Sequence, residues 1–124
     1  MGTVILFSMS NVFRSRAMAR RYNAHKALHL QDPCALCTDN SIKDFTHWRV
    51  LENDFPYDVV AKTHHMIVPK RHITEQEIEP HEWAEFKVIK KTYMELYDAI
   101  IEGTPRMKSI PGHFHLHLII ERGN

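Results

Sequence analysis

Histidine alternates with large apolar residues near the end of the chain, in the run His-Phe-His-Leu-His-Leu-Ile at positions 113–119. Successive side chains of a β-strand point to opposite faces, so His113, His115 and His117 are expected on one face, with core residues on the other. Imidazoles at alternate strand positions lie roughly 6 to 7 Å apart, which allows two or three of them to reach one phosphate or one metal ion. Because buried imidazoles without partners cost free energy, the row predicts an anionic ligand or a metal.

The two cysteines of the chain, Cys34 and Cys37, have the Cys-x-x-Cys spacing of half a metal site or of a redox pair. Since the chain has no further cysteines for a disulfide framework, a reduced, intracellular protein is the simpler expectation. An Asp-Pro pair at 32–33 precedes them, and positions 34–40 are rich in turn formers. We therefore expect the two thiols on a tight loop.

Length and composition limit what surrounds these residues. A chain of 124 residues is long enough for one hydrophobic core but not for two independent ones. The apolar fraction of 44% and the charged fraction of 25% are typical of an ordinary globular protein. No apolar run approaches the roughly 18 residues that span a membrane, so no membrane partner is expected.

The net charge of +1 hides an asymmetry between the start of the chain and the rest, because residues 1–31 contain no acid. Their cations are Arg14, Arg16, Arg20, Arg21 and Lys26. This composition predicts a basic N-terminal helical segment, 1–31, with a helix from Ser10 or Asn11 to about Leu30. A mitochondrial targeting segment is the alternative, and Met9 is an alternative start of the chain.

Nucleic acid is not expected as a partner of this basic segment. Its cations could meet phosphates, but half of the residues between them are Ala or Ser rather than the aromatic side chains that stack on bases. The remaining residues, 32–124, are expected to form the main domain.

Two strands are expected between the N-terminal helix and the next helix. The run at 45–51 is aromatic and β-branched, and a polar segment ending in Pro56 stops it. The run at 64–68 alternates and ends at Pro69. These runs predict a β-meander.

Thr74 and Glu77 form the capping-box pattern that begins a helix, and Pro80 suits the first turn of a longer one. Apolar residues then recur every three to four positions, which predicts a core-facing helix of about twenty residues. This stripe consists of Trp83, Phe86, Ile89 or Lys90, Tyr93, Leu96 or Tyr97, and Ile100. Gly103 is expected to end the helix, and a loop then leads into the histidine strand.

Three motifs together resemble those of one known family. The run at 113–119 matches the His-φ-His-φ-His-φ-φ signature of the histidine triad (HIT) superfamily of nucleotide hydrolases and transferases. Positions 64–72, His-His-Met-Ile-Val-Pro-Lys-Arg-His, look like the family's strand that ends in a Pro-Lys-Arg-His turn. Positions 52–56, Glu-Asn-Asp-Phe-Pro, are similar to the galactose-1-phosphate uridylyltransferase branch. The resemblance covers about residues 34–121.

The resemblance implies an α+β fold with a HIT-like antiparallel sheet, one long helix and a short helix, to which the sequence adds the basic N-terminal helix. It also implies a homodimer, because members of this family commonly pair across the long helix and the sheet.

The resemblance implies three catalytic histidines. His115 matches the nucleophile that attacks the α-phosphorus of a nucleotide and forms a covalent nucleotidyl-histidine. A neutral imidazole is a competent nucleophile when an acceptor holds its other ring nitrogen and so fixes the tautomer. His117 matches a partner on the phosphate side, and His64 matches a histidine of the adjoining strand that closes the phosphate site.

Three further positions are expected to bind the nucleotide. Asn53 lies near the family's ribose-binding position, where a side-chain amide can bond sugar hydroxyls. Ser109 and Lys108 precede the triad where the family usually has a hydroxyl residue and a glutamine. Lys108 would either meet a phosphate as a point charge or be solvated. This departure from the pattern supports an alternative in which the triad binds a nucleotide without turnover.

The zinc-bearing branches of the superfamily imply a metal site. In those branches two cysteines, a histidine after the Pro-Lys-Arg turn and the first triad histidine bind the ion, and the matching positions are Cys34, Cys37, His72 and His113. Two thiolates and two imidazoles suit Zn²⁺, and a set with no open position is structural. Such a site would fix the N-terminal loop against the strand that carries His115.

The sequence therefore predicts a nucleotide hydrolase or nucleotidyl transferase that acts through a covalent nucleotidyl-histidine. A transferase or phosphorylase with a sugar-phosphate or phosphate acceptor is one alternative, and a non-catalytic nucleotide-binding module is the other. The expected partner is a nucleotide or nucleotide conjugate, and the expected location is cytoplasmic.

Overall fold

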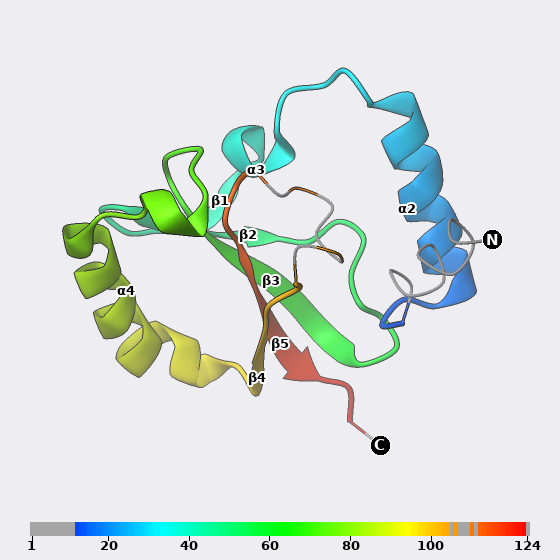
Figure 1. The fold of residues 1–124 in the computed structure, drawn as a ribbon. Coiled ribbons are helices and arrows are strands. Elements are labelled where there is room, and N and C mark those ends of the chain that lie inside the picture. Colours follow the sequence, from blue (N-terminus) through cyan, green and yellow to red (C-terminus); the bar gives the residue numbers. More distant parts are fainter. Residues whose placement is uncertain (1–11, 105, 107–109, 111, 124) are drawn as a thin grey trace.

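The computed structural model describes residues 12–104, 106, 110 and 112–123. This part of the chain forms an α+β fold, as predicted, with an open antiparallel sheet in the order β1-β2-β3-β5-β4 (Figure 1). The strands are β1 (Ser41–Asp44), β2 (Trp48–Glu52), β3 (Ala61–Pro69), β4 (Ala99–Ile101) and β5 (Leu116–Glu121). The α-helices are α2 (Arg16–Leu28), α3 (Ala35–Thr38) and α4 (Pro80–Thr92), with 3₁₀ turns η1 (Glu75–Glu77) and η2 (Tyr93–Leu96).

The central pair of strands, β3 and β5, brings the two histidine motifs together. Their antiparallel register places Met66 opposite His117 and His64 opposite Ile119. Paired residues in a sheet project to the same face, so His64 and His117 emerge on one face, one register step apart.

The main core lies on the opposite face, between the sheet and α4 (Figure 1). Phe114, Leu116 and Leu118 all belong to it, which confirms the predicted apolar side of the alternating run. Helix α4 contributes Phe86 and Ile89 to the same core. This packing fixes which way the intervening histidines face.

The histidine face is buried as well, as the prediction of a ligand or a metal at this row assumed. A smaller cluster of Leu36, Leu51, Met66 and Val68 joins α3 to this face of β2 and β3. The histidines of the row are exposed by only 0% at His113, 6% at His115 and 6% at His117. Every imidazole of the row therefore needs a polar partner inside the protein or on a ligand.

The N-terminal helix begins later than predicted. The predicted caps, Ser10 and Asn11, lie outside the described residues, but turn residues at 12–14 precede α2, and Ser15 caps it by accepting the Met18 N–H at 3.1 Å. Serine is a favoured N-cap, and the pattern simply offered several candidates. The helix ends at Leu28, close to the predicted end.

The long helix is shorter than predicted. The capping box of Thr74 and Glu77 is present, but it caps the turn η1, and α4 begins at Pro80 with thirteen residues. Ile100, predicted in the last helical turn, lies in β4 and pairs with Leu118. The helical prediction was wrong here. A run of three apolar residues is too short for its pattern to distinguish a helix from a strand, and pairing with β5 decides the conformation.

The region around the cysteines has more structure than predicted. The expected loop contains the one-turn helix α3, and the expected strand at 45–51 is β2, shifted to Trp48–Glu52. The edge strand β1 was not predicted, because its short, exposed run Ser41–Asp44 shows no alternating pattern.

Candidate active site and metal centre

Four side chains gather at the start of the histidine row, and they are the four predicted metal ligands. The donor atoms of Cys34, Cys37, His72 and His113 all lie within 4.8 Å of one another. The Cys37 sulfur lies 3.2 Å from His72 Nδ1 and 3.3 Å from His113 Nδ1, and the Cys34 sulfur lies 3.7 Å from His113 Nδ1. We call these four residues the Cys/His cluster.

The donor chemistry of the Cys/His cluster fits zinc. Tetrahedral Zn²⁺ with two thiolates and two imidazoles separates its donor atoms by about 3.3 to 3.8 Å, close to the separations seen here. His113 Nε2 donates to the Pro69 carbonyl at 2.9 Å, so the neutral ring carries its lone pair on Nδ1, the atom that faces the sulfurs. These residues lie close enough to hold a metal ion, and the set is compatible with zinc.

Burial shifts the pKa values of two groups of the Cys/His cluster. Burial is the main cause that lowers the pKa of His113, so its ring stays neutral, as a metal ligand requires. Burial, with the neighbouring Cys34, raises the pKa of the Cys37 thiol. A bound cation would reverse that shift, because a coordinating thiol is deprotonated.

Two arginines hold the segments that carry the ligands. Arg49, almost fully buried, donates to the Leu36 carbonyl and, at 2.5 Å, to the Asp39 carbonyl, which fixes the turn around Cys37. On the other side, Arg71 makes a two-point bond to the buried Glu82 carboxylate at 2.6 and 3.0 Å.

His115, the predicted nucleophile, has a defined orientation. Its Nδ1 lies 2.9 Å from the His113 carbonyl oxygen, which can only accept, so Nδ1 carries the proton. The neutral ring then has its lone pair on Nε2, the nitrogen that a nucleophile would use. Its ring centroid lies 5.2 Å from that of His117.

His64 and His117 form a bonded pair, and Tyr57 closes it at both ends. His64 Nε2 lies 2.8 Å from His117 Nδ1, and His117 Nε2 lies 3.3 Å from the Tyr57 hydroxyl. The backbone N–H of Tyr57 donates to His64 Nδ1 at 2.9 Å. The Tyr57 ring also packs against both imidazoles, with centroids 4.4 and 4.9 Å away. We call Tyr57, His64 and His117 the histidine relay.

The bond from Tyr57 fixes the tautomers along this relay. Because His64 Nδ1 accepts a backbone N–H, the His64 proton must lie on Nε2, and His117 Nδ1 must accept it. The neutral His117 ring therefore carries its own proton on Nε2, facing the Tyr57 hydroxyl. Burial, followed by the charge of Arg14, lowers the pKa of His64 to about 3 and keeps that ring neutral.

Of the three predicted nucleotide-binding residues, Asn53 is the one that the structure describes. Asn53 lies beside the relay, 3.4 Å from His64 Nε2 through its side-chain nitrogen, while its side-chain oxygen accepts the Phe55 N–H at 2.8 Å. The oxygen is thus engaged in the turn, and a ribose contact of Asn53 stays a prediction. Lys108 and Ser109 lie outside the described residues.

Sequence reasoning missed Tyr57. It lies one residue beyond the motif that ends at Pro56, and it has no histidine neighbour in the sequence. Its contact with His117 spans sixty residues, so the only available signal was an aromatic residue next to a recognised motif.

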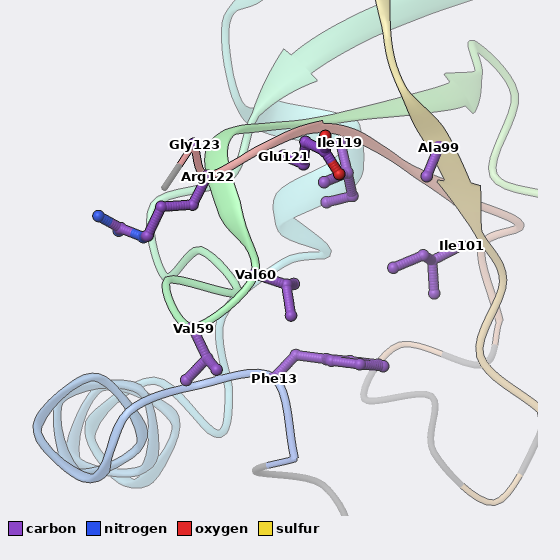
Figure 2. Close-up of a pocket in the computed structure, with 9 residues that line it drawn as sticks. All are labelled: Phe13, Val59, Val60, Ala99, Ile101, Ile119, Glu121, Arg122 and Gly123. Atoms are coloured by element: carbon purple, nitrogen blue, oxygen red, sulfur yellow. The ribbon is translucent and has the colours of Figure 1, made fainter.

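An open groove lies on the same sheet face beyond His117. Its volume is about 510 Å³, and residues of the N-terminal segment, the loop before β3, β4 and β5 line it. Figure 2 shows the Phe13 side chain extending below Val60 towards Ile101 of β4. Ile119, two residues after His117 on β5, also lines the groove, so the groove lies next to His117 along this strand.

Comparisons with known proteins give a likeness in fold. No protein-family model matches the chain, and no curated protein matches it. A solved structure described as a hypothetical protein from Leishmania major covers 80% of this chain and 71% of its own, with a TM-score of 0.52 and 16% identity. Another, described as "Hit Like Protein", covers 78% and 95%, with a TM-score of 0.47 and 21% identity.

The Leishmania structure shows that most of this chain shares a known fold, and at 16% identity it shows nothing more. Among the described residues, no helix is both long and apolar enough to cross a membrane.

Proposed function

We propose that the chain is a HIT superfamily protein that hydrolyses or transfers nucleotides through a covalent nucleotidyl-histidine on His115. One observation carries the proposal: the bond from His115 Nδ1 to the His113 carbonyl leaves the lone pair on Nε2, beside the histidine relay. A nucleophilic imidazole needs this arrangement, in which one nitrogen is held by an acceptor and the other attacks.

The reaction would proceed in two in-line displacements. His115 Nε2 attacks the α-phosphorus, an N–P bond forms, and the bond from phosphorus to the leaving group breaks. The His117 Nε2–H donates a hydrogen bond to a phosphate oxygen and keeps its proton, and the departing group takes its proton from solvent; the attacking water later returns one proton to solvent. Water or a second acceptor then attacks the same phosphorus, which releases the nucleotide and restores neutral His115.

Zn²⁺ would be held by the Cys/His cluster. With four protein donors and no open position it supplies rigidity rather than chemistry. His113 belongs to this cluster, and its backbone carbonyl orients the His115 ring. A metal bound to His113 would therefore help to hold the nucleophile in place.

Kinetics with nucleoside phosphoramidates and dinucleoside polyphosphates test the proposal. Wild type should release free mononucleotide, and His115→Asn should lose at least about 10⁴-fold in kcat, because removing the nucleophile of such a unit removes most of its catalysis. If His115→Asn turns over as fast as wild type, His115 is not the nucleophile.

The same assay separates the alternatives. The similarity of positions 52–56 to uridylyltransferases favours a sugar-phosphate or phosphate acceptor, so each is added in turn. Nucleotide exchange that depends on an acceptor, without release in water alone, would identify a transferase or phosphorylase. Nucleotide binding without turnover by either wild type or variant would identify a binding module.

A homodimer is also proposed, formed in part along the edge strand β4. Ile100 on that strand and Val88 and Leu96 on the neighbouring helical segment are apolar and exposed by 40%, 62% and 67%. An exposed strand edge is a template for pairing. Sedimentation of wild type and Ile100→Asp should show a dimer and a monomer, respectively. The cytoplasmic location and the domain boundary at residue 31 stay predictions.

A further inference from the structure

Three consecutive residues of the N-terminal segment, Phe13, Arg14 and Ser15, hold the loop that precedes β3. Val59 donates its N–H to the Phe13 carbonyl at 3.1 Å. Ser15 donates its backbone N–H and its hydroxyl to the two Asp58 carboxylate oxygens, at 2.7 and 2.6 Å. The segment that appeared separate from the main domain in the sequence is thus tied to a loop more than forty residues away.

Arg14, the middle one of these three residues, contacts the same loop through Phe55 and Tyr57. Its guanidinium lies 4.1 Å from the centroid of the Tyr22 ring and 4.9 Å from that of the Tyr57 ring. Its Nε donates to the Phe55 carbonyl at 2.8 Å. A planar guanidinium can lie over aromatic rings and also donate from its edge to a carbonyl, whereas the ammonium group of lysine is a point charge and is not expected to reproduce all three contacts.

The loop held by Arg14 is the loop that fixes the relay. Tyr57 supplies the N–H that sets the His64 tautomer, and its hydroxyl faces His117 Nε2. A shift of Tyr57 would leave His64 free to carry its proton on either nitrogen, and His117 would lose its fixed proton with it.

We propose that Arg14 is a positioning residue for the histidine relay, acting through the Phe55 carbonyl and the Tyr57 ring to hold His64 and His117 in single tautomers. The catalytic consequence rests on the proposed function, whereas the tautomer consequence does not. The basic N-terminal segment is then part of the active site's support.

Electrostatics agree with this geometry. The charge of Arg14 is one of the causes, after burial, that lower the pKa of His64. A cation near His64 disfavours the doubly protonated ring, which could not accept the Tyr57 N–H.

Nitrogen-15 NMR of histidine-labelled protein tests the proposal without a substrate. Long-range ¹H–¹⁵N spectra distinguish a protonated ring nitrogen from an accepting one, and His64→Gln and His117→Gln assign the signals. In wild type, His64 and His117 should both show the Nε2–H form. In Arg14→Ala both should become mixtures of tautomers, and Arg14→Lys should restore less than half of the change. Arg20→Ala removes an exposed arginine of helix α2, which follows Arg14, and as the matched control it should match wild type.

Activity adds a second readout. If the proposed function holds, Arg14→Ala should lower kcat about tenfold and change KM less than threefold, since misplaced catalytic groups affect the chemical step. A folded Arg14→Ala protein with wild-type tautomers would overturn the proposal, and so would an equal effect of Arg20→Ala. If Arg14→Ala does not fold, Arg14→Lys decides alone: wild-type spectra from it overturn the proposal. Wild type that turns over nothing refutes the proposed function and leaves the NMR test intact.

Discussion

The two ends of the histidine row are built from the same residue type at alternating positions, yet their partners differ completely. At one end His113 directs a lone pair on Nδ1 at two sulfurs and gives its proton to a backbone carbonyl. At the other end His117 accepts from His64 through Nδ1 and keeps its proton on Nε2, facing the Tyr57 hydroxyl. Hydrogen-bond partners from neighbouring segments, rather than the position in the row, decide which ring nitrogen carries the proton, and therefore whether that imidazole can bind a metal or donate a hydrogen bond.

This difference predicts two kinds of mutational effect. Changes at the Cys/His cluster should appear mainly in stability, because the cluster ties a loop and a turn to the sheet. Changes at the histidine relay should appear in the chemical step and in the pH dependence of stability. His115 lies between the two and depends on both, through the His113 carbonyl and through its contact with His117.

The largest expected effect is at the Cys/His cluster. Cys37→Ser should lower the zinc content from about one ion per chain towards none and reduce the free energy of unfolding by about 4 kcal/mol or more, because loss of a metal is one of the few changes with so large an effect. Metal analysis and denaturant unfolding measure both. Full zinc content in Cys34→Ser and Cys37→Ser would refute the site.

The next effect is the pH dependence of stability that His64 of the histidine relay contributes. The folded pKa of His64 is about 3, below its unfolded value near 6.5. Between these two pH values the unfolded chain binds a proton at His64 and the folded protein does not. The stability from His64 is present above pH 6.5 and falls as pH drops towards 3, by up to about 1.4 kcal/mol per pH unit. His64→Gln should flatten this slope at unchanged zinc content. An unchanged slope would mean that His64 titrates normally.

A smaller effect is expected at the ion pair between Arg71 and Glu82, which holds the turn next to His72. Hydrogen bonds from Arg71 are the main cause that lowers the pKa of Glu82 to about 2. The pair therefore stabilises the protein above about pH 4.5 and loses this effect as pH falls towards 2. Because Arg71 is half exposed, Glu82→Gln should cost about 1 to 2 kcal/mol at pH 7. Exposed Glu95→Gln is the control and should stay within about 0.5 kcal/mol of wild type.

The smallest effect is expected for the Tyr57 hydroxyl. Tyr57→Phe keeps the ring and the backbone N–H and removes only the group that faces His117 Nε2. It should cost about 1 kcal/mol or less in stability and lower kcat about fivefold, the value of one neutral hydrogen bond. Thermal unfolding and kinetics measure these values. A loss comparable to that of His115→Asn would give the phenol a larger role than the relay allows.

Part of this arrangement was predictable from local pattern. The alternating run placed Phe114, Leu116 and Leu118 in the core, because period-two patterning reports directly on a half-buried strand. The four members of the Cys/His cluster came from motif resemblance, since no local pattern relates Cys34 to His113.

The remainder depends on contacts between distant segments. Arg14 lies 41 residues from the carbonyl that it binds, and its basic surroundings looked like a solvated helix. Strand β4 was assigned to a helix because its three residues carry too little pattern to distinguish the two. Such features are set by packing, which a single sequence does not reveal.

The division of labour along the row can be tested most directly by locating a covalent adduct. Wild-type protein is mixed with a nucleoside phosphoramidate, quenched within the first turnovers, digested and examined by mass spectrometry. We predict one nucleotidyl group per chain, attached to His115 and absent from the peptide of His115→Asn. A nucleotidyl group on His113 or His117, or turnover in which no adduct is ever trapped, would contradict the assignment of His113 to the metal and His115 to the reaction.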